Sequence, residues 1–266
     1  MDTLFSTLSV LPQKNGVFLH RQKAGETSSW KTFQEREKAF WRHKILHTDY
    51  QPDPKKNFAP FLGHWGIDSS FFQGKNAIET GSGPFGFFAG LQRICADHLP
   101  TPLIIADPLL EFYQQFTLMR MMPRDAILLQ ARGEDIPLPD HCMDIIVSTN
   151  TIDHVEDSFA FLKEARRILK DNGTLLFSVH VLPSFLASGK SLIKHLDRNH
   201  PHHFTARGIH DLFSNTGFSI TRARQVPMYL EDDIPTEIQG WKRVMYFLAF
   251  RCLRTFYGMA RLQKNT

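Results

Sequence analysis

Cysteine is scarce in this chain of 266 residues, which contains only Cys95, Cys142 and Cys252. Three widely spaced thiols form neither a disulfide framework nor a zinc-binding pattern, so we expect a reducing, cytoplasmic environment. The chain also lacks any run of about 18 apolar residues that could span a bilayer. Its start, MDTLFSTLSVLPQKNG, has an acidic second residue and a short apolar run, so we expect no secretory signal there.

Internal repeats and low-complexity tracts are also absent, and the formal net charge is a modest +4. Such an excess suits an anionic ligand or a membrane surface without choosing between them. Outside the C-terminal segment, no dense Lys/Arg stripe with interleaved aromatic residues is present, so we do not expect a nucleic-acid substrate. The hydrophobic fraction of 42% is ordinary for a globular protein. We therefore expect one core domain with appendages.

The chain divides into three regions that differ in composition and hydrophobic pattern. Residues 1–70 are predicted to form a helical preamble, because KTFQEREKAFWRHKIL (31–46) places aromatic residues at helical spacing among charges. Residues 71–228 are predicted to form the core, with an insertion at about 183–204. Residues 229–266 form a basic, aromatic C-terminal segment.

The core alternates short apolar runs with amphipathic ones. The predicted strands are NAIET, PLIIA, DAILLQ, MDIIVST and GTLLFSVH, and one more strand follows Gly217. The predicted helices include FGFFAGLQRICADHL, LLEFYQQFTLM and SFAFLKEARRILK, the last of which we expect to end at Gly173 in a left-handed cap. This alternation predicts an α/β fold with three layers and a doubly wound, mostly parallel sheet.

The C-terminal segment GWKRVMYFLAFRCLRTFYGMARLQK (240–264) allows two structures. We favour a helical extension, because Arg243, Arg251, Arg254 and Arg261 then gather on one arc. The alternative is that RVMYFLAFR forms a final strand of the sheet. As a helix, residues 239–262 could dock on the domain or make peripheral contact with a membrane surface.

ETGSGPFG (79–86) follows the first predicted strand of the core. Ligands of an open parallel sheet bind beyond the carboxyl ends of its strands, and glycines let the backbone approach them closely. Asp107 ends the second strand, where a carboxylate can accept hydrogen bonds from both hydroxyls of a ribose. Glu79 stands before the first glycine, where its charge would repel a pyrophosphate and attract an ammonium or a sulfonium.

Residues 74–225 resemble the class I S-adenosylmethionine-dependent methyltransferases, in the subgroup with an LPxxD...D...DH segment. ETGSGPFG resembles the first motif of that family, D/E-x-G-x-G-x-G, with one extra residue before Gly86. IIADPLLEFY resembles the second motif, and GEDIPLPDHCMDIIVSTNTIDHVED resembles the segments on the adenine side and after the fourth strand. FLKEARRILKDNGTLLFSV resembles L-x-E-x-x-R-V-L-K-P-G-G without the Pro and one Gly.

The resemblance implies S-adenosylmethionine as the cofactor and a Rossmann-like fold. The methionine end would lie near Glu79, Thr149 and Asn150, and the ribose near Asp107. The adenine would lie against Leu109. The full set of cofactor-binding residues implied is Glu79, Thr80, Gly81, Ser82, Gly83, Gly86, Asp107, Pro108, Leu109, Gly133, Glu134, Asp135, Thr149 and Asn150. One departure concerns the adenine edge, because Arg132 stands where many relatives have an acid.

Methyl transfer from a sulfonium is an in-line displacement that needs alignment and exclusion of water. A general base helps only when the acceptor stays protonated at neutral pH. His154, beside Asp153, is the candidate base, although a histidine there could equally bind a loop carbonyl. The loop NHPHHFT (199–205) brings His202 and His203 together. It could be structural, contact substrate or bind a metal, and we expect no metal site.

The preamble is predicted to act as a lid over cofactor and acceptor. Trp41, Phe58 and Phe61 are candidates for this lid, with a place in the hydrophobic core as the alternative. His64 and Trp65, in a glycine-flanked stretch, are the candidates we favour for the pocket.

We therefore predict a methyltransferase that acts on a small-molecule or glycan-type acceptor, which could be lipid-linked. A second hypothesis is a module that binds S-adenosylmethionine without transferring its methyl group. A third is a nicotinamide-dependent oxidoreductase, because GSGPFG also satisfies the G-x-G-x-x-G spacing. The sequence indicates neither the acceptor atom nor an oligomeric state.

Overall fold

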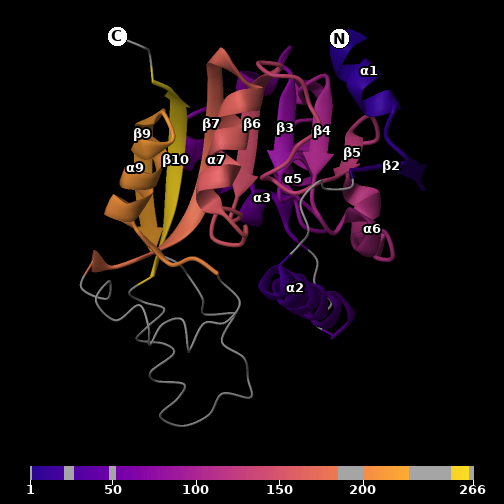
Figure 1. Cartoon of the computed structure of the whole chain (residues 1–266), viewed down its shortest axis with the longest axis horizontal. Helices are drawn as coiled ribbons and strands as arrows, with labels where there is room; N and C mark the ends of the chain where they lie inside the picture. Colours follow the sequence, from indigo (N-terminus) through magenta and orange to yellow (C-terminus); the bar gives the residue numbers. More distant parts are fainter. Residues whose placement is uncertain (1, 21–26, 48–51, 185–200, 228–252, 264–266) are drawn as a thin grey trace.

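Most strands of the core lie parallel in one sheet. The computed structural model describes residues 2–20, 27–47, 52–184, 201–227 and 253–263 (Figure 1). The sheet has the order β1-β2-β5-β4-β3-β6-β7-β10-β9, and β8 pairs with β7. Its strands are β1 (Gln13–Lys14), β2 (Val17–Leu19), β3 (Ala77–Thr80), β4 (Leu103–Ala106), β5 (Ile127–Gln130), β6 (Met143–Thr149), β7 (Leu169–Leu182), β8 (Phe204–Thr205), β9 (Phe218–Pro227) and β10 (Arg254–Leu262).

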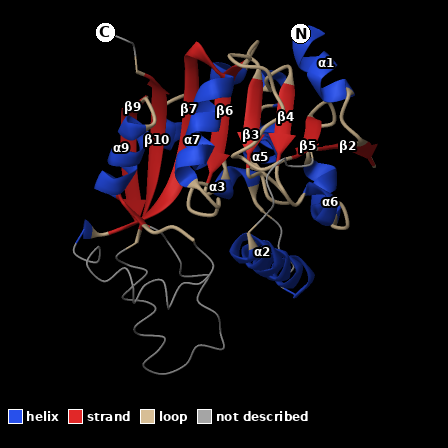
Figure 2. Cartoon of the chain, in the orientation of Figure 1, coloured by secondary structure: helices blue, strands red, loops and turns tan. Residues whose placement is uncertain are grey.

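Helices cover both faces of this sheet (Figure 2). The described helices are α1 (Asp2–Ser9), α2 (Ser28–His47), α3 (Pro54–Asn57), α4 (Ala59–Trp65), α5 (Phe87–Ile94), α6 (Leu110–Tyr113), α7 (Ser158–Ile168) and α9 (Ala206–Asn215), with short 3₁₀ turns at Ser69–Phe72, Ala96–His98 and Thr117–Met121. One core cluster joins the sheet to α1, α7 and α9, and a second joins it to α4 and α5.

Alternation along the central strands produces the two cores. Ile78 contributes to the cluster with α7, whereas its neighbour Ala77 contributes to the cluster with α5. Ile104 and Ile105 divide in the same way. Because successive side chains of a strand point to opposite faces, a strand buried on both faces is an unbroken apolar run. The predicted three-layer, mostly parallel α/β fold is confirmed.

The C-terminal prediction is wrong where the structure describes it. Residues Arg254–Leu262 form β10, an antiparallel strand between β7 and β9, instead of part of a helix. Phe256 and Ala260 are buried in the sheet, and Gly258 lies against Phe177. This stretch therefore cannot lie on a membrane as an amphipathic helix. The alternative strand RVMYFLAFR, and most of the segment 239–262, lie outside the described residues, as does most of the predicted insertion at 183–204.

Gly173 does not cap the helix before it. α7 already ends at Ile168, and β7 begins at Leu169, which pairs with Met143 of β6. The Asp-Asn-Gly sequence that resembles a helix stop is therefore part of the strand β7. Leu169 is buried, so continuing the helix would remove this side chain from the core.

The first 70 residues are not purely helical. β1 and β2 form a hairpin whose turn residues, Asn15 and Gly16, both have positive φ. Asn-Gly is the sequence favoured at a two-residue hairpin turn. β2 then pairs in parallel with β5, so this segment extends the same sheet as the core. The expected boundaries at residues 70 and 228 remain predictions.

The helix predicted over residues 31–46 is present as α2, which begins three residues earlier. Within the described part of the chain, none of the helices combines the length and the apolar character needed to cross a membrane.

Replacing Gly258 by Ala should destabilise the sheet. An added Cβ would lie 2.2 Å from Cζ of Phe177, a buried ring that stacks on Phe213 at 4.3 Å. We expect the free energy of unfolding to fall by about 1–3 kcal/mol in urea titrations, as for other overpacked cores.

Gly63→Ala is the matched control for Gly258→Ala. A Cβ at Gly63 meets no atom within 4 Å, and Ala favours the helix α4. Equal unfolding midpoints for the two variants would contradict the placement of β10.

Candidate functional site

A cavity of about 460 Å³ lies at the carboxyl ends of β3, β4 and β6. α2 lies beyond these strand ends in Figure 1 and contributes one wall of the cavity. The cavity is lined by Trp30, Phe33, Gln34, Glu37, Phe40, Trp41, Lys44, Phe58, Gly81, Ser82, Gly83, Pro84, Phe85, Gly86, Asp107, Pro108, Leu109, Tyr113, Arg132, Gly133, Glu134, Thr149, Asn150, Thr151, His154, Val155 and His180.

The glycine turn after β3 is pressed against the loop after β6. Gly81 has φ +70°, and an added Cβ would lie 2.2 Å from Cγ2 of Thr151. The Thr151 hydroxyl lies 3.1–3.3 Å from the carbonyl oxygens of Thr80, Gly81 and Thr149, each of which can accept its one hydrogen. Glycine is therefore required at position 81 by both conformation and space.

Glu79 stands behind this turn and does not line the cavity. Its Oε1 accepts a hydrogen bond from the amide of Phe87 at 2.5 Å, and Oε2 accepts one from Phe88 at 3.1 Å. These are amides of the first turn of α5, so the carboxylate closes the start of that helix. Burial raises the pKa of Glu79 to about 7 against the effect of these hydrogen bonds.

Gly86 lets α5 begin against that carboxylate. It has φ +72°, and an added Cβ would lie 2.9 Å from Oε2 of Glu79. Gly86, the third glycine of the motif, is therefore needed because a side chain there would collide with the buried Glu79 carboxylate.

Asp107 lies on the floor of the cavity and is only 5% exposed. Its Oδ1 accepts from the amide of Leu109 at 2.8 Å, and Oδ2 accepts from the amide of Gly83 at 2.9 Å. The carboxylate thus ties the end of β4 to the glycine turn. Burial raises the pKa of Asp107 to about 7, the two amides lower it, and the nearby Glu37 carboxylate raises it further.

Arg132 fills the position at which many methyltransferases have an acid. Its Nη2 lies 3.1 Å from Oε1 of Glu134 and 2.6 Å from Oε2 of Glu156. Its guanidinium carbon lies 4.6 Å from the ring centroid of Trp30 in α2. Gly133 and Glu134 line the cavity beside it.

Asp135 does not reach the cavity with its two neighbours. Its Oδ2 lies 3.0 Å from Nε2 of His20, which follows β2. Of the fourteen predicted cofactor-binding residues, the cavity lining includes eleven and leaves out Glu79, Thr80 and Asp135. The Thr80 hydroxyl is buried and donates to the carbonyl of Val147.

The predicted lid residues divide between cavity and core. Trp41 and Phe58 line the cavity, whereas Phe61 packs in the core against Trp65. The prediction that Trp65 lines the pocket is corrected: it is fully buried, and its Nε1 donates to the carbonyl of Phe177.

His64 is corrected in the same way. Its ring packs on Tyr257 of β10 at 4.4 Å and lies outside the cavity lining. Burial and the charge of Arg224 lower the pKa of His64. Because α4 packs against the sheet, its last turn faces β10 and not the glycine loop.

The candidate bases also divide. His154 lines the cavity, and its Nδ1 lies 3.8 Å from Oε2 of Glu37. Asp153 is 2% exposed, lies outside the cavity lining, and has an Oδ1 atom with no hydrogen-bond partner among the described residues.

His202 and His203 lie outside the cavity lining as well. Nε2 of His202 lies 3.0 Å from the carbonyl of Val155, and its amide donates to the carbonyl of Asp153. His202 therefore fastens the histidine loop to the loop after β6. Among the described residues, no three His, Cys, Asp or Glu side chains are grouped so that they could hold a metal ion.

Residues that the sequence did not single out complete the cavity. They include Glu37 and Lys44 of α2, Thr151, and His180, whose Nδ1 lies 3.4 Å from the Thr255 hydroxyl. α2 is a helix of 20 residues of which only Trp30 is buried. A long helix that mixes aromatic and charged residues without a broad apolar stripe is a sequence signal for a partly exposed cover.

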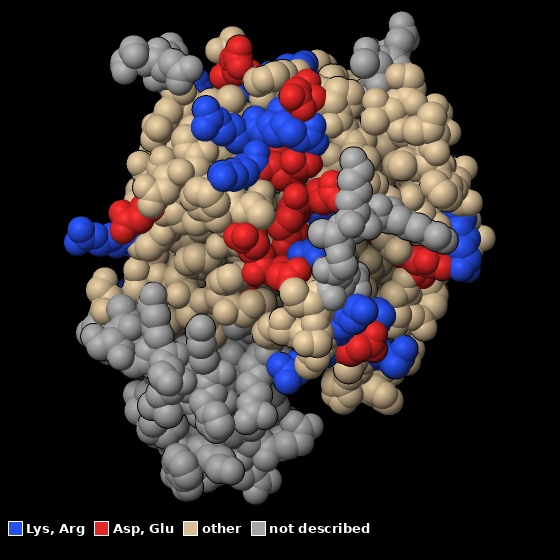
Figure 3. Space-filling model, in the orientation of Figure 1, with Lys and Arg blue, Asp and Glu red and all other residues tan. Residues whose placement is uncertain are grey.

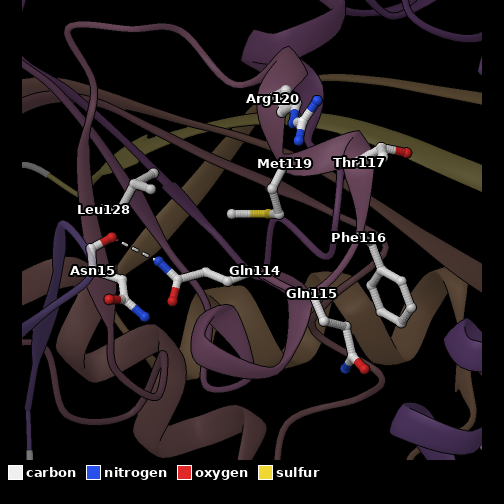
Figure 4. A pocket seen from close by; sticks show the side chains of 8 residues that line it. All are labelled: Asn15, Gln114, Gln115, Phe116, Thr117, Met119, Arg120 and Leu128. Atoms are coloured by element: carbon white, nitrogen blue, oxygen red, sulfur yellow. Dashed lines mark hydrogen bonds between the residues drawn. The ribbon is translucent and has the colours of Figure 1, made fainter.

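Two further surface features are a group of acidic side chains (Figure 3) and a second cavity. Acidic side chains gather in the middle of the face shown in Figure 3, with basic ones around them. A separate cavity of about 370 Å³ lies near the hairpin β1–β2, where the Gln114 side chain donates to the carbonyl of Asn15 (Figure 4). It shares none of its residues with the larger cavity.

Comparison with known proteins concerns the sequence family and the fold. Residues 92–177 match a family model described as a methyltransferase domain. Two proteins of Mycobacterium tuberculosis, each named a "Probable S-adenosylmethionine-dependent methyltransferase", are 35% identical to this chain over 51 residues. Together with the fold, these matches support a class I S-adenosylmethionine-dependent methyltransferase. The matched segment spans 19% of this chain and 19% of each of these relatives.

Solved structures share the fold of the methyltransferase domain. Geranyl diphosphate C-methyltransferase from Streptomyces coelicolor has a TM-score of 0.64 at 10% identity, covering 90% of this chain and 100% of that one. The cyclase SpnF has a TM-score of 0.60 at 11% identity, covering 91% and 98% of the two chains. At such identities the likeness concerns the fold alone.

The stability of the methyltransferase domain should fall as the pH rises. Glu79 and Asp107 have pKa values raised to about 7, above the ordinary 4.5 and 3.8. Between the ordinary pKa values and about pH 7, these two carboxyl groups keep their protons in the folded chain but have released them in the unfolded chain. The free energy of unfolding should therefore fall, by up to about 1.4 kcal/mol per pH unit for each group.

Urea unfolding at pH 5 and pH 8 measures this loss. Asp107→Asn should lose less stability between the two pH values than the unaltered chain. Asp125→Asn makes the same change of charge at an exposed position and should lose as much as the unaltered chain. An equal loss in both variants would show that Asp107 is already ionised in the folded state at pH 5.

Proposed function

We propose that this chain transfers a methyl group from S-adenosylmethionine to a small molecule with an apolar body, bound in the 460 Å³ cavity. The observation that carries this proposal is the buried Asp107 carboxylate, placed on the cavity floor beside a glycine turn. The volume is within the range of about 300–1,000 Å³ typical of small-molecule sites.

The residues present fit the cofactor. Gly81 and Gly83 line the cavity without side chains of their own, with Thr151 packed against the first and Trp41 near the second, and Asp107 offers a carboxylate to ribose hydroxyls. Leu109 supplies an apolar surface next to it. S-adenosylmethionine, when bound, supplies a methyl group already activated on a sulfonium.

Charge in the cavity favours a cation over a pyrophosphate. Three acids, Glu37, Asp107 and Glu134, line it beside two bases, Lys44 and Arg132. The guanidinium of Arg132 is already paired with Glu134 and Glu156. A dinucleotide would bring two phosphate charges into this acidic site, whereas a sulfonium would be attracted to it. This supports the methyl donor over the nicotinamide hypothesis.

Aromatic side chains favour an apolar acceptor. Trp30, Phe33, Phe40, Trp41, Phe58 and Phe85 all line the cavity. Such walls bury apolar surface and exclude water, which are the two contributions that in-line methyl transfer needs from the protein. The walls offer less to a glycan, so we place the glycan-type acceptor second.

A second candidate function is reaction or binding without methyl transfer. The cyclase SpnF has the same fold, so the fold alone does not require transfer. Methyl-labelled S-adenosylmethionine, incubated with the chain and a panel of apolar acceptors, separates the two functions. Labelled product supports transfer, whereas binding without any labelled product supports the second candidate.

At pH 8, above the pKa of about 7 for Asp107, Asp107→Asn should weaken S-adenosylmethionine binding about ten-fold or more, because hydrogen bonds to a charged group contribute about 1.5–3 kcal/mol. Isothermal titration calorimetry measures this affinity, and circular dichroism checks that the variant is folded.

Asp125→Asn, which lies outside the cavity lining, is the control and should bind like the unaltered chain. NAD⁺ should bind much more weakly than S-adenosylmethionine. Tighter binding of NAD⁺, or unchanged affinity in Asp107→Asn, would refute the proposed function.

A further inference from the structure

Glu37 and His154 face each other across the cavity although they come from distant parts of the chain. Glu37 lies on α2, and His154 lies in the loop after β6. Oε2 of Glu37 is 3.8 Å from Nδ1 of His154, and both side chains are partly buried. At this distance an imidazolium and a carboxylate attract each other, and partial burial limits screening by solvent.

A second interaction fixes the Glu37 carboxylate. Its Oε1 accepts a hydrogen bond from Nε1 of Trp41 at 2.7 Å. Trp41 in turn packs edge-on against Tyr113 and lies near Gly83 of the glycine turn. This hydrogen bond orients the Glu37 carboxylate so that its other oxygen, Oε2, faces His154. The Trp41 ring that donates it lies beside the glycine turn.

Glu37 lies close to His154 because α2 packs against the rest of the chain. At one end of the helix, Trp30 stacks on Arg132, and further along, Arg42 lies over the ring of Phe112. These contacts hold α2 against α6 and the loop after β5. Asp153, the neighbour of His154 in sequence, is buried outside the cavity lining and does not replace Glu37 there.

We propose that Glu37 is the positioning residue for His154, and that His154 takes the proton of a phenol-type hydroxyl as that oxygen is methylated. This inference rests on the proposed function and narrows its acceptor to an aromatic hydroxyl. An aromatic acceptor suits walls made of Trp and Phe rings. A phenol is mostly protonated at neutral pH, so a base assists its attack.

The proton and electron pairs balance within this site. The phenol oxygen forms its bond to the methyl carbon, and the carbon–sulfur bond breaks with its electron pair left on sulfur. The hydroxyl proton passes to Nε2 of His154, which makes the ring an imidazolium. The Glu37 carboxylate on the Nδ1 side stabilises this charge, and solvent later takes the proton.

A spectroscopic test needs neither acceptor nor turnover. Nitrogen-15 NMR of the histidine-labelled chain with S-adenosylhomocysteine reports which ring nitrogen of His154 carries the proton, and His154→Gln assigns the signal. A carboxylate beside Nδ1 should hold the proton there, and Glu37→Gln should move the tautomer towards Nε2–H. The same tautomer in both proteins would overturn the inference.

A kinetic test uses two phenols of different acidity, para-cresol and para-nitrophenol, with methyl-labelled S-adenosylmethionine. Glu37→Gln should lower kcat for para-cresol about ten-fold, and His154→Gln about a hundred-fold or more. Both variants should lower kcat for the more acidic para-nitrophenol much less, because a larger fraction of it is already ionised. His154→Gln should leave KM for S-adenosylmethionine unchanged, because the neutral imidazole is not one of the carboxylates that attract the sulfonium.

Glu35→Gln is the matched control on the same helix. Its side chain is 71% exposed and pairs with Lys38, so both phenols should react as with the unaltered chain. An equal loss for both phenols in Glu37→Gln would indicate a structural role and overturn the proposal. Failure of the unaltered chain to methylate either phenol while it binds S-adenosylmethionine would overturn the phenol assignment but leave the cofactor site standing. Failure to bind S-adenosylmethionine would refute the proposed function itself.

Discussion

Two buried carboxylates determine the shape of the candidate site. Glu79 binds the first amides of α5, and Asp107 binds the amides of Gly83 and Leu109. Glu79 thus joins the end of β3 to the start of α5. Asp107 joins the end of β4 to the glycine turn after β3. A buried carboxylate is costly unless its oxygens are hydrogen-bonded, so these amides have little freedom to move. The glycine turn keeps its open form because it lies between these two fixed points.

The two acids differ in what they can offer a ligand. Glu79 is enclosed behind the turn, and its role is to anchor α5. Asp107 keeps a small exposed fraction on the cavity floor, where its oxygens can accept a ligand hydroxyl in addition to the amides of Gly83 and Leu109. The resemblance placed Glu79 next to the methionine ammonium. In this structure its charge would act on that group through the turn and not by direct contact.

Much of the fold could be predicted because its signals are local. Continuous apolar runs such as Ile104–Ile105 indicate buried parallel strands, and the glycine turn and Asp107 follow from motif spacing. β10 was not predicted because its alternating burial depends on a slot between β7 and β9 that no local pattern reveals. The prediction that His64 and Trp65 line the pocket was wrong for a related reason. His64 and Trp65 look like a glycine-flanked loop in the sequence, but the packing of α4 turns them towards the sheet.

The placement of α2 connects binding to chemistry. Its contacts with the rest of the site include a cation–ring contact at Trp30, a ring contact at Trp41 and a carboxylate near His154. Trp30 is buried, and Trp41 and Ile45 pack against the cluster of Leu109, Tyr113 and Phe116, so apolar contacts also dock the helix. The acid beside the histidine is supplied by α2 because that helix docks over the cavity. The neighbouring Asp153 is buried outside the cavity lining and cannot take this place. The docking of α2 therefore both excludes water from the cavity and brings a carboxylate to His154.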